Sequence, residues 1–373
     1  MSTMLQLLMT IVRVGVDLAK NVIQVHAVDR DGRRVAARAL RREQFLEFCT
    51  KLPKGCVVAM EACGSAHDWA RQLRALGLDA RLIAGHLVTP YRMQGRSGKN
   101  DANDAAAICE AASRPNMRFV PIKSAQQQAL VALHTWRSAV KDERTACINF
   151  IRSQLGEFGI VFAKGPKALR AKLPDTLEDA ENALPGQARL VIQEAFEHWQ
   201  ALDEKMKWCD QRVGEHVRSS APARAAARIV GIGPLGASAH IAKVGDFSQF
   251  ASAKQFAAWE GLVPRQKSSG GKISLGAITK RGDEYLRTLL IQGAKSAVMT
   301  AHKRKDSISQ WVLQLRERVG WQKACVALAN KNARILWAMM TREQPYDPNH
   351  VPASPCAKTP GAAANRAAVA IAN

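Results

Sequence analysis

The sequence predicts an α/β domain at the N-terminus, followed by a mainly α-helical remainder. Short stretches that alternate apolar and polar residues, with helical stretches between them, fill the chain up to about residue 121. Long helical patterns dominate from residue 124 onward. Four acidic residues fall at predicted strand ends or at a helix start within the first part, so we expect the chemistry to lie there.

The first part begins with three predicted strands. Residues 12–17 alternate with period two, residues 22–29 repeat this pattern, and an extended run continues to residue 40. Asp31-Gly32 separates the second and third runs, and this dipeptide is typical of hairpin turns. These observations predict a three-stranded meander.

Helices and strands then alternate. Residues 44–52 have a helical pattern, residues 56–60 form a buried-strand run, and residues 66–76 form an amphipathic helix that Gly77 ends. A short strand follows at residues 79–84. This alternation is typical of an α/β domain.

The remainder of the chain is predicted to be helical. Residues 124–157 and 187–219 form long helical stretches, typical of spacers or coiled-coil pairing surfaces, and Pro166, Pro174 and Pro185 are predicted to break the segment between them. The predicted domains are a leader at 1–10, the α/β domain at 11–122, a long-helix spacer at 123–221, a C-terminal domain at 222–345 and a disordered tail at 346–373.

The composition favours a nucleic-acid partner. The 373 residues include 54 Lys and Arg against 32 Asp and Glu, a formal net charge of +22, and such an excess attracts polyanions. No uninterrupted apolar run of membrane-spanning length occurs, which predicts a soluble intracellular protein. The eight cysteines stand singly without zinc-ligand spacing, so we expect reduced, buried thiols and no zinc site.

Four acidic residues, Asp17, Glu61, Asp101 and Asp104, form the candidate catalytic and metal-binding set. Carboxylates in a confined site repel one another unless a cation neutralises them, and hard oxygen ligands favour Mg²⁺ or Mn²⁺. The alternative is structural, because any one of these residues can cap a turn or stabilise a helix N-terminus. The set as a whole favours metal-dependent chemistry on a phosphodiester.

A basic loop precedes the last two acids. Arg92, Arg96 and Lys99 lie in or beside the glycine-bearing segment 94–99, where they can hold a phosphate next to the metal ions. The spacing does not match a nucleotide-binding loop, and a solvated basic loop is the alternative. Farther along, the Gly231-Ile232-Gly233 segment fits either a phosphate-binding helix-hairpin-helix turn or a tight turn between helices.

The stretch from 264 to 305 is strongly basic and predicts a surface for polyanions. Within it, Ser268 and Ser269 precede two glycines in a flexible segment that can deliver a hydroxyl group to a distant site. A serine needs an activating base or metal, and most loop serines have no chemical role. The basic residues of this stretch are Arg265, Lys267, Lys272, Lys280, Arg281, Arg287, Lys295, Lys303, Arg304 and Lys305.

Taken together, these motifs resemble the DEDD transposases of the insertion-sequence one-ten family, in particular the branch with a serine-serine-glycine-glycine loop. The resemblance covers about residues 11–345, and its motifs lie at 15–20, 60–64, 99–105, 231–233 and 259–290. It implies a RuvC-like, ribonuclease-H-like N-terminal domain, a coiled-coil spacer and a C-terminal transposase domain. It also implies a bacterial, cytoplasmic protein associated with the nucleoid.

The resemblance further implies a recombinase guided by a noncoding bridge RNA. By that analogy Asp17, Glu61, Asp101 and Asp104 hold Mg²⁺, and Ser269 attacks the DNA backbone to form a transient phosphoserine link; Ser268 is adjacent. The two domains would meet across subunits of a dimer or tetramer. Partner DNA would be contacted by Arg96, Lys99, Arg265, Lys267, Lys272, Lys280 and Arg281.

Two other functions fit the residues. One is a metal-only nuclease of the junction-resolvase type, in which the acids direct water at the phosphate and the serine loop only binds DNA. The other is a noncatalytic nucleic-acid-binding protein whose acids are structural. The identity of the nucleophile and the need for metal separate these three functions.

Overall fold

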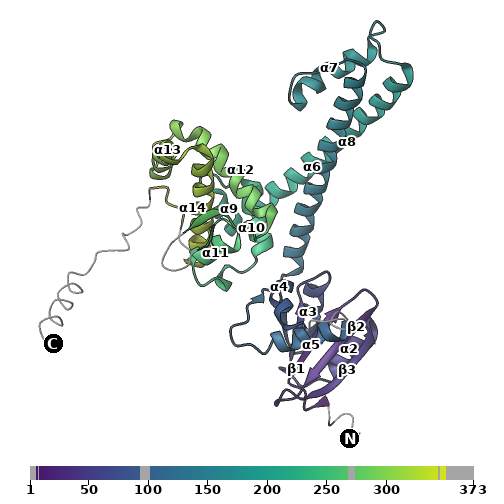
Figure 1. Cartoon of the computed structure of the whole chain (residues 1–373), viewed down its shortest axis with the longest axis vertical. Helices are drawn as coiled ribbons and strands as arrows, with labels where there is room; N and C mark the ends of the chain where they lie inside the picture. The colour runs from purple at the N-terminus through teal and green to yellow at the C-terminus, as the bar shows by residue number, and fades with distance from the viewer. Residues whose placement is uncertain (1–5, 7, 93–100, 268–273, 343–344, 350–373) are drawn as a thin grey trace, which may run out of the picture. The chain divides into compact units, whose positions relative to one another are not determined.

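The computed structural model describes residue 6 and residues 8–92, 101–267, 274–342 and 345–349, with Asp101 described for its backbone only (Figure 1). The chain forms two compact units, which are treated separately below. The first comprises Met1–Cys209 and Ala239–Gln249, and the second comprises Asp210–Ser238 and Phe250–Asn373. Most of the predicted leader, and the predicted disordered tail from residue 350 onward, lie outside the described residues.

The first unit contains a mixed six-stranded sheet with the strand order β3-β2-β1-β4-β5-β6. The meander of β1, β2 and β3 is antiparallel, as predicted, whereas β4 pairs with β1 and β5 pairs with β4 in parallel. The edge strand β6 is too short to be predicted from alternation. The strands are β1 Arg13–Leu18, β2 Val22–Val28, β3 Arg34–Arg41, β4 Val57–Glu61, β5 Asp79–Ile83 and β6 Phe119–Val120.

Helices cover both faces of this sheet, which explains why its central strands read as apolar runs. Along β4, Val58 and Met60 belong to the cluster that contains Phe45 and Trp69, whereas Ala59 belongs to a second cluster with residues of α5. The Phe45 and Trp69 rings meet edge to face, with centroids 5.1 Å apart. The helices are α2 Arg42–Thr50, α3 Ala66–Ala75, α4 Gly85–Val88, η1 Thr89–Tyr91 and α5 Asp101–Ala111.

Long helices continue the first unit. Helix α6, Ala125–Glu157, begins at Ser124, whose hydroxyl accepts from the Gln127 amide in a capping box. Helix α8 spans Gly186–Ser219. As positions rise along α6 their partners fall along α8, because Glu143 contacts His198 and Cys147 contacts Ala195, so the two helices are antiparallel. The two long helices were predicted within about two residues.

Pro174 corrects one prediction about this region. Helix α7 spans Pro166–Glu178 and contains Pro174 in its interior, where a break had been predicted. Leu169 and Leu173 are fully buried against α6 and α8 in the same cluster. This burial offsets the hydrogen bond that the proline removes.

The second unit is mainly helical, as predicted, with one hairpin that was not predicted (Figure 1). Helix α14 is its centre, and Ala324, Leu328 and Leu336 lie on its buried face at helical spacing. Within the described residues, no helix of the chain combines the length and apolar character needed to cross a membrane. Its elements are α9 Ala221–Ala227, α11 Ala253–Trp259, β7 Pro264–Gln266, β8 Leu275–Ile278, α12 Glu284–Thr300, η3 Ala301–Lys303, α13 Ser307–Val319 and α14 Trp321–Arg342. Helix α10, Pro234–Val244, begins in this unit and ends in the first, which also contains η2 Phe247–Gln249.

Candidate active site

Asp17 and Glu61 lie at the carboxyl ends of two neighbouring strands, on the same edge of the sheet. The parallel strands β1 and β4 pair Val16 with Met60, and the two acids are the next residues along each strand. Both carboxylates act on the nearby Cys63 thiol, whose pKa is raised first by burial, then by Glu61 and then by Asp17. The sheet topology therefore places the two carboxylates in one electrostatic environment.

Helix α5 supplies Asp104 because Gly15 lets that helix approach β1 closely. A Cβ atom at position 15 would overlap the Ala105 carbonyl oxygen and the Cys109 backbone nitrogen, so any other residue would push α5 away. Asp101 lies one turn before Asp104 in the same helix. We call Asp17, Glu61 and Asp104 the carboxylate edge.

Arg92 bridges two members of the carboxylate edge. Its Nη2 donates to Glu61 Oε2 at 3.0 Å, and its Nε forms an ion pair with Asp104 Oδ1 at 2.9 Å. The Glu61 and Asp104 side chains are 29% and 17% exposed, so both are partly shielded from water. A single guanidinium therefore neutralises two carboxylates that would otherwise repel each other.

Gly85 at the start of α4 makes room for Glu61. A Cβ atom there would overlap Glu61 Oε1, so a side chain at this position would displace the carboxylate. Sequence reasoning noted Arg92 only as a possible phosphate contact, and it did not identify Gly85. Neither role leaves a sequence pattern, because both depend on how β4, α4 and α5 meet in space.

The donors of the carboxylate edge fit a hard divalent cation. All are carboxylate oxygens, which Mg²⁺ and Mn²⁺ prefer, and the raised pKa of Cys63 keeps the one adjacent thiol protonated. Among the side chains that the structure describes, no three His, Cys, Asp or Glu residues gather closely enough to hold a metal ion. The Asp101 side chain is not among them. The oxygen donors of the carboxylate edge thus suit a divalent ion. In the structure the Arg92 guanidinium supplies the positive charge between Glu61 and Asp104.

The remaining predicted site residues divide into two groups. Arg96, Lys99, Ser268, Ser269 and Lys272 lie outside the described residues. Arg265, Lys267, Lys280 and Arg281 are exposed on the β7–β8 hairpin or just after it. The Lys267 amide donates to the Ser274 carbonyl at 2.9 Å, so one backbone hydrogen bond joins the two residues that flank 268–273.

The base of this hairpin is held by close backbone packing. Gly261 has φ of +73°, and a Cβ atom at Gly282 would overlap the Trp259 carbonyl oxygen. Arg287 donates to the Gly282 carbonyl at 3.1 Å and is buried. Its assignment to the polyanion surface was therefore wrong, because a buried guanidinium that binds backbone carbonyls is structural.

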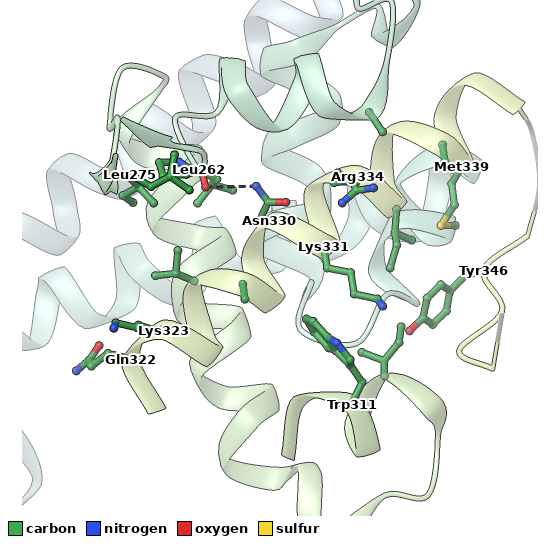
Figure 2. A pocket seen from close by; sticks show the side chains of 18 of the residues that line it. Leu262, Leu275, Trp311, Gln322, Lys323, Asn330, Lys331, Arg334, Met339 and Tyr346 are labelled. Carbon is green, nitrogen blue, oxygen red and sulfur yellow. Dashed lines mark hydrogen bonds between the residues drawn. The ribbon is translucent and has the colours of Figure 1, made fainter. Parts of the chain in front are cut away.

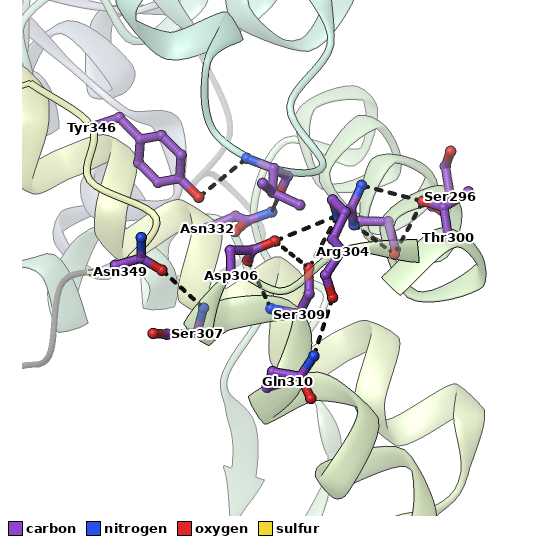
Figure 3. A network of polar contacts seen from close by, with 12 residues as sticks. Ser296, Thr300, Arg304, Asp306, Ser307, Ser309, Gln310, Asn332, Tyr346 and Asn349 are labelled. Atoms are coloured by element: carbon purple, nitrogen blue, oxygen red, sulfur yellow. Dashed lines mark hydrogen bonds and ion pairs between the residues drawn. The ribbon is translucent and has the colours of Figure 1, made fainter. Parts of the chain in front are cut away.

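Arg304 was also counted in the basic surface, and the structure places it at the junction of α12 and α13 instead (Figure 3). Its Nη2 donates to the Ala297 carbonyl at 2.9 Å and its Nε donates to Ser309 Oγ at 3.0 Å. Asp306 caps α13 through the Ser309 amide and lies 3.7 Å from the Arg304 guanidinium. Arg304 therefore joins two helices.

The Gly231-Ile232-Gly233 segment forms the turn between α9 and α10. The carbonyl of the preceding residue, Val230, accepts from Asn332 Nδ2 at 2.8 Å (Figure 3). A Cβ atom at Gly293 of α12 would overlap the Gly231 carbonyl oxygen. Gly231 therefore faces the interior of the second unit. This packing favours the tight-turn interpretation over a phosphate-binding role for Gly231.

Two family models match most of this chain. A family model described as "Transposase IS116/IS110/IS902 family" matches residues 223–309, and a DEDD model described as "Transposase" matches residues 14–160. A Pseudomonas aeruginosa protein named "Probable family 20 transposase" is 48% identical over 341 residues, which cover 91% of this chain and 100% of that protein.

Two further relatives are named for insertion sequences. The transposase for insertion sequence element IS1111A of Coxiella burnetii is 40% identical over 332 residues, which cover 89% of this chain and 90% of that protein. The transposase for insertion sequence element IS1328 of Yersinia enterocolitica is 36% identical over 331 residues, which cover 88% and 96% of the two chains.

Proposed function

The chain belongs to the IS116/IS110/IS902 family of transposases, enzymes of insertion sequences that cleave DNA and transfer its strands, and we propose that the carboxylate edge carries this chemistry. The observation that supports this proposal most strongly is the convergence of Glu61 and Asp104 on one guanidinium, beside Asp17. Glu61 of β4 and Asp104 of α5 would repel each other without a shared positive charge, and such a pair of carboxylates suits a bound cation.

DEDD transposases use divalent metal ions, and we propose Mg²⁺, with Mn²⁺ as a substitute. Asp17, Glu61, Asp101 and Asp104 would hold it. When bound, such ions neutralise charge on the phosphate oxygens and stabilise the leaving oxygen. The residues of the chain contribute the geometry: Gly15 sets the approach of α5 to β1, and Gly85 sets the position of Glu61.

Arg92 would exchange partners during this process. In the structure it contacts both Glu61 and Asp104, and if these carboxylates held a metal ion the guanidinium would be free to leave them. A free guanidinium can then form two parallel bonds to a DNA phosphate. This role combines the phosphate contact expected from the sequence with the contacts that the structure provides.

We propose Ser269 as the nucleophile. Its Oγ would attack the scissile phosphorus, form a serine phosphodiester and break the bond to one bridging oxygen of the DNA, which takes a proton to become a free hydroxyl. A strand hydroxyl that attacks this phosphoserine restores the DNA link and returns the serine. The support is its place between paired strands whose base is fixed by Gly261 and Gly282.

A noncoding guide RNA and self-association complete the proposal. A net charge of +22 favours binding of both RNA and DNA backbones, while base pairing would select the sequence. The long helices α6 and α8 expose Trp136, Phe150 and Leu190, and such large apolar side chains on antiparallel helices suit pairing with a second copy in a coiled-coil dimer or tetramer. Light scattering tests this pairing by measuring the molar mass of the Trp136→Glu variant. If the pairing is right, the variant is more monomeric than the wild type.

Trapping the covalent intermediate tests the function. The purified protein, its element's RNA and end-junction DNA are incubated with Mg²⁺, and a denaturant-resistant protein–DNA adduct is sought. We expect the adduct in the wild type and in Ser268→Ala, and its loss in Ser269→Ala and Asp17→Ala. Cleaved DNA without an adduct, unaffected by either serine change, would instead identify a metal-only nuclease.

A further inference from the structure

The second unit contains a large groove beside the β7–β8 hairpin, and none of its lining residues belongs to the proposed catalytic set. It lies between the β7–β8 hairpin, the outer face of α14 and residues 345–347, and its volume is about 1270 Å³ (Figure 2). No role has been assigned above to this surface. Its two sides differ in chemistry.

One side of the groove is apolar. Leu262, Leu275 and Ile278 of the hairpin and its base line it, and the Leu275 side chain is 61% exposed although leucine is costly to leave in water. Trp311 and Tyr346 add aromatic rings to the lining (Figure 2). An apolar lining of this size favours a partner with flat, apolar faces.

The other side is cationic. Lys323, Lys331, Arg334 and Arg342 of α14 all line the groove, whereas Asp347 is its one acidic lining residue. At 100° per residue these four positions fall within about 100° of one helix face, and a rise of 1.5 Å per residue spreads them over about 28 Å. The four cations therefore form a stripe, here called the α14 stripe.

The α14 stripe differs from the carboxylate edge in its partners. Within the part of the chain that the structure describes, none of its four side chains forms an ion pair with a carboxylate, in contrast to Arg92. The Lys331 amine lies 4.4 Å from the centre of the Trp311 ring, a contact that holds the cation at the groove (Figure 2). The pKa of Lys331 is lowered by burial and then by Arg334, which an external anion would reverse.

We propose that this groove binds a single strand of DNA, with unpaired bases on the apolar side and phosphates on the α14 stripe. Charge complementarity selects a polyanion, and the apolar lining selects one whose bases are accessible. Duplex DNA stacks its bases inside and offers such a groove only its phosphates. An acidic peptide would satisfy the stripe, but it would leave the aromatic and aliphatic side without planar partners.

This inference rests on the DNA strand transfer of the proposed function, and it assigns a place for the strand that such a reaction displaces. Exchange of strands requires base pairs to open and to form again, and unpaired bases are costly in water unless they stack on a surface. A groove with the α14 stripe on one side stabilises that state.

Fluorescence anisotropy of the full-length protein tests the groove. The probes are a labelled DNA strand of about twelve nucleotides, the matching duplex and the RNA of the same sequence. Arg334→Glu places an acid in the stripe, and Arg318→Glu makes the same charge change at an exposed residue of α13 that does not line the groove. We expect Arg334→Glu to weaken single-strand DNA binding about tenfold relative to Arg318→Glu, and duplex binding about twofold at most.

Lys331→Gln, which removes charge without adding an acid, is expected to weaken single-strand DNA binding by about threefold. Equal losses in Arg334→Glu and Arg318→Glu would overturn the inference, because the effect would then be general charge. A loss confined to the duplex, or to the RNA, would overturn it as well, as would competition by an acidic peptide at the same concentration as the DNA strand.

Failure of the inference is distinguishable from failure of the proposed function. Asp104→Asn is expected to abolish strand transfer and to leave single-strand binding unchanged. If the wild type transfers strands while Arg334→Glu binds DNA like its control, the groove assignment alone is wrong. If Asp104→Asn still transfers strands while Arg334→Glu weakens single-strand binding, the role proposed for the carboxylate edge is wrong and the groove assignment is retained.

Discussion

The carboxylate edge of the first unit and the α14 stripe of the second differ in how their charges are balanced. Arg92 neutralises Glu61 and Asp104 from within the chain, at 3.0 and 2.9 Å, whereas the four cations of the α14 stripe pair with no described carboxylate. An internally balanced site has to exchange a partner before it can bind a cation, and an unbalanced stripe binds its anion directly. This difference fits a catalytic role for the carboxylate edge and a binding role for the α14 stripe.

The largest expected effect tests whether the two regions are functionally separate. Asp104→Asn removes one carboxylate and leaves Arg92 with Glu61 alone, so the rate of strand transfer is expected to fall at least about 1000-fold. Single-turnover assays with Mg²⁺ measure this rate. Arg318→Glu, an exposed change that lies in neither region, serves as the control, and a comparable loss in that variant would show that the effect is not specific to the carboxylate edge.

The first unit also contains a buried acid whose charge is neutralised by two arginines of the same chain. Asp203 is 8% exposed and pairs with both Arg144 and Arg170, whose guanidinium groups also lie over the Trp199 ring. Asp203→Ala removes the buried acid that joins the partly shielded Arg144 to the more exposed Arg170, so the free energy of unfolding should fall by about 3 kcal/mol in urea titrations.

The matched control for that change is Glu143→Ala. Glu143 pairs with His198 on the exposed side of the same helices, and loss of such a pair costs about 0.5 kcal/mol. Equal costs for the two substitutions would show that Asp203 is not a structural centre of the helical pair.

Arg92→Gln sharpens the comparison by removing the internal cation. A divalent ion then meets no competitor at Glu61 and Asp104, so Mn²⁺ should bind about fivefold more tightly in the absence of DNA, as expected for ion pairs worth about 1 kcal/mol. Calorimetry or electron paramagnetic resonance reports this affinity without any activity assay. Arg114→Gln, which breaks an exposed pair on α5 with Glu110, should leave the affinity unchanged; unchanged affinity in Arg92→Gln as well would refute the exchange.

The smallest expected effect concerns a neutral histidine. The pKa of His67 is lowered to about 4 by burial, Lys123 and Arg71, and its Nδ1 accepts from the Lys123 amide at 3.2 Å. Because the folded state binds the proton more weakly than the unfolded state, stability is retained above pH 6.5 and lost as the pH falls toward 4.

Allowing for solvent screening at this half-buried site, the loss between pH 7 and pH 4 should be about 1 kcal/mol. Thermal unfolding measures it as a fall in Tm, and His67→Gln should reduce the pH dependence. A pH dependence that is the same in both proteins would exclude His67 as its source.

The sequence predicted those features that depend on local patterns. Period-two alternation located the meander of β1 to β3, and helical spacing located α6 and α8, because these patterns report which side chains are buried. The shared edge of Asp17 and Glu61 also followed, since both acids come at the ends of predicted strands.

Features that depend on tertiary contacts could not be predicted. The approach of α5 to Gly15, the Arg92 bridge and the Gly282 contact join segments that are far apart in the chain, and no local pattern encodes them. Pro174 illustrates the same limit, because burial of Leu169 and Leu173 outweighs a strong helix-breaking signal. The α14 stripe was detectable in principle from the helical spacing of its cations, but not its position beside an apolar hairpin.

The most direct test of the carboxylate edge is a crystal structure of the full-length protein with Mn²⁺, read through its anomalous scattering. The proposed function predicts anomalous density bonded to carboxylate oxygens of Asp17, Glu61 and Asp104, with Arg92 moved away from Glu61. Arg92 still between Glu61 and Asp104, with Mn²⁺ bound elsewhere or not at all, would contradict it.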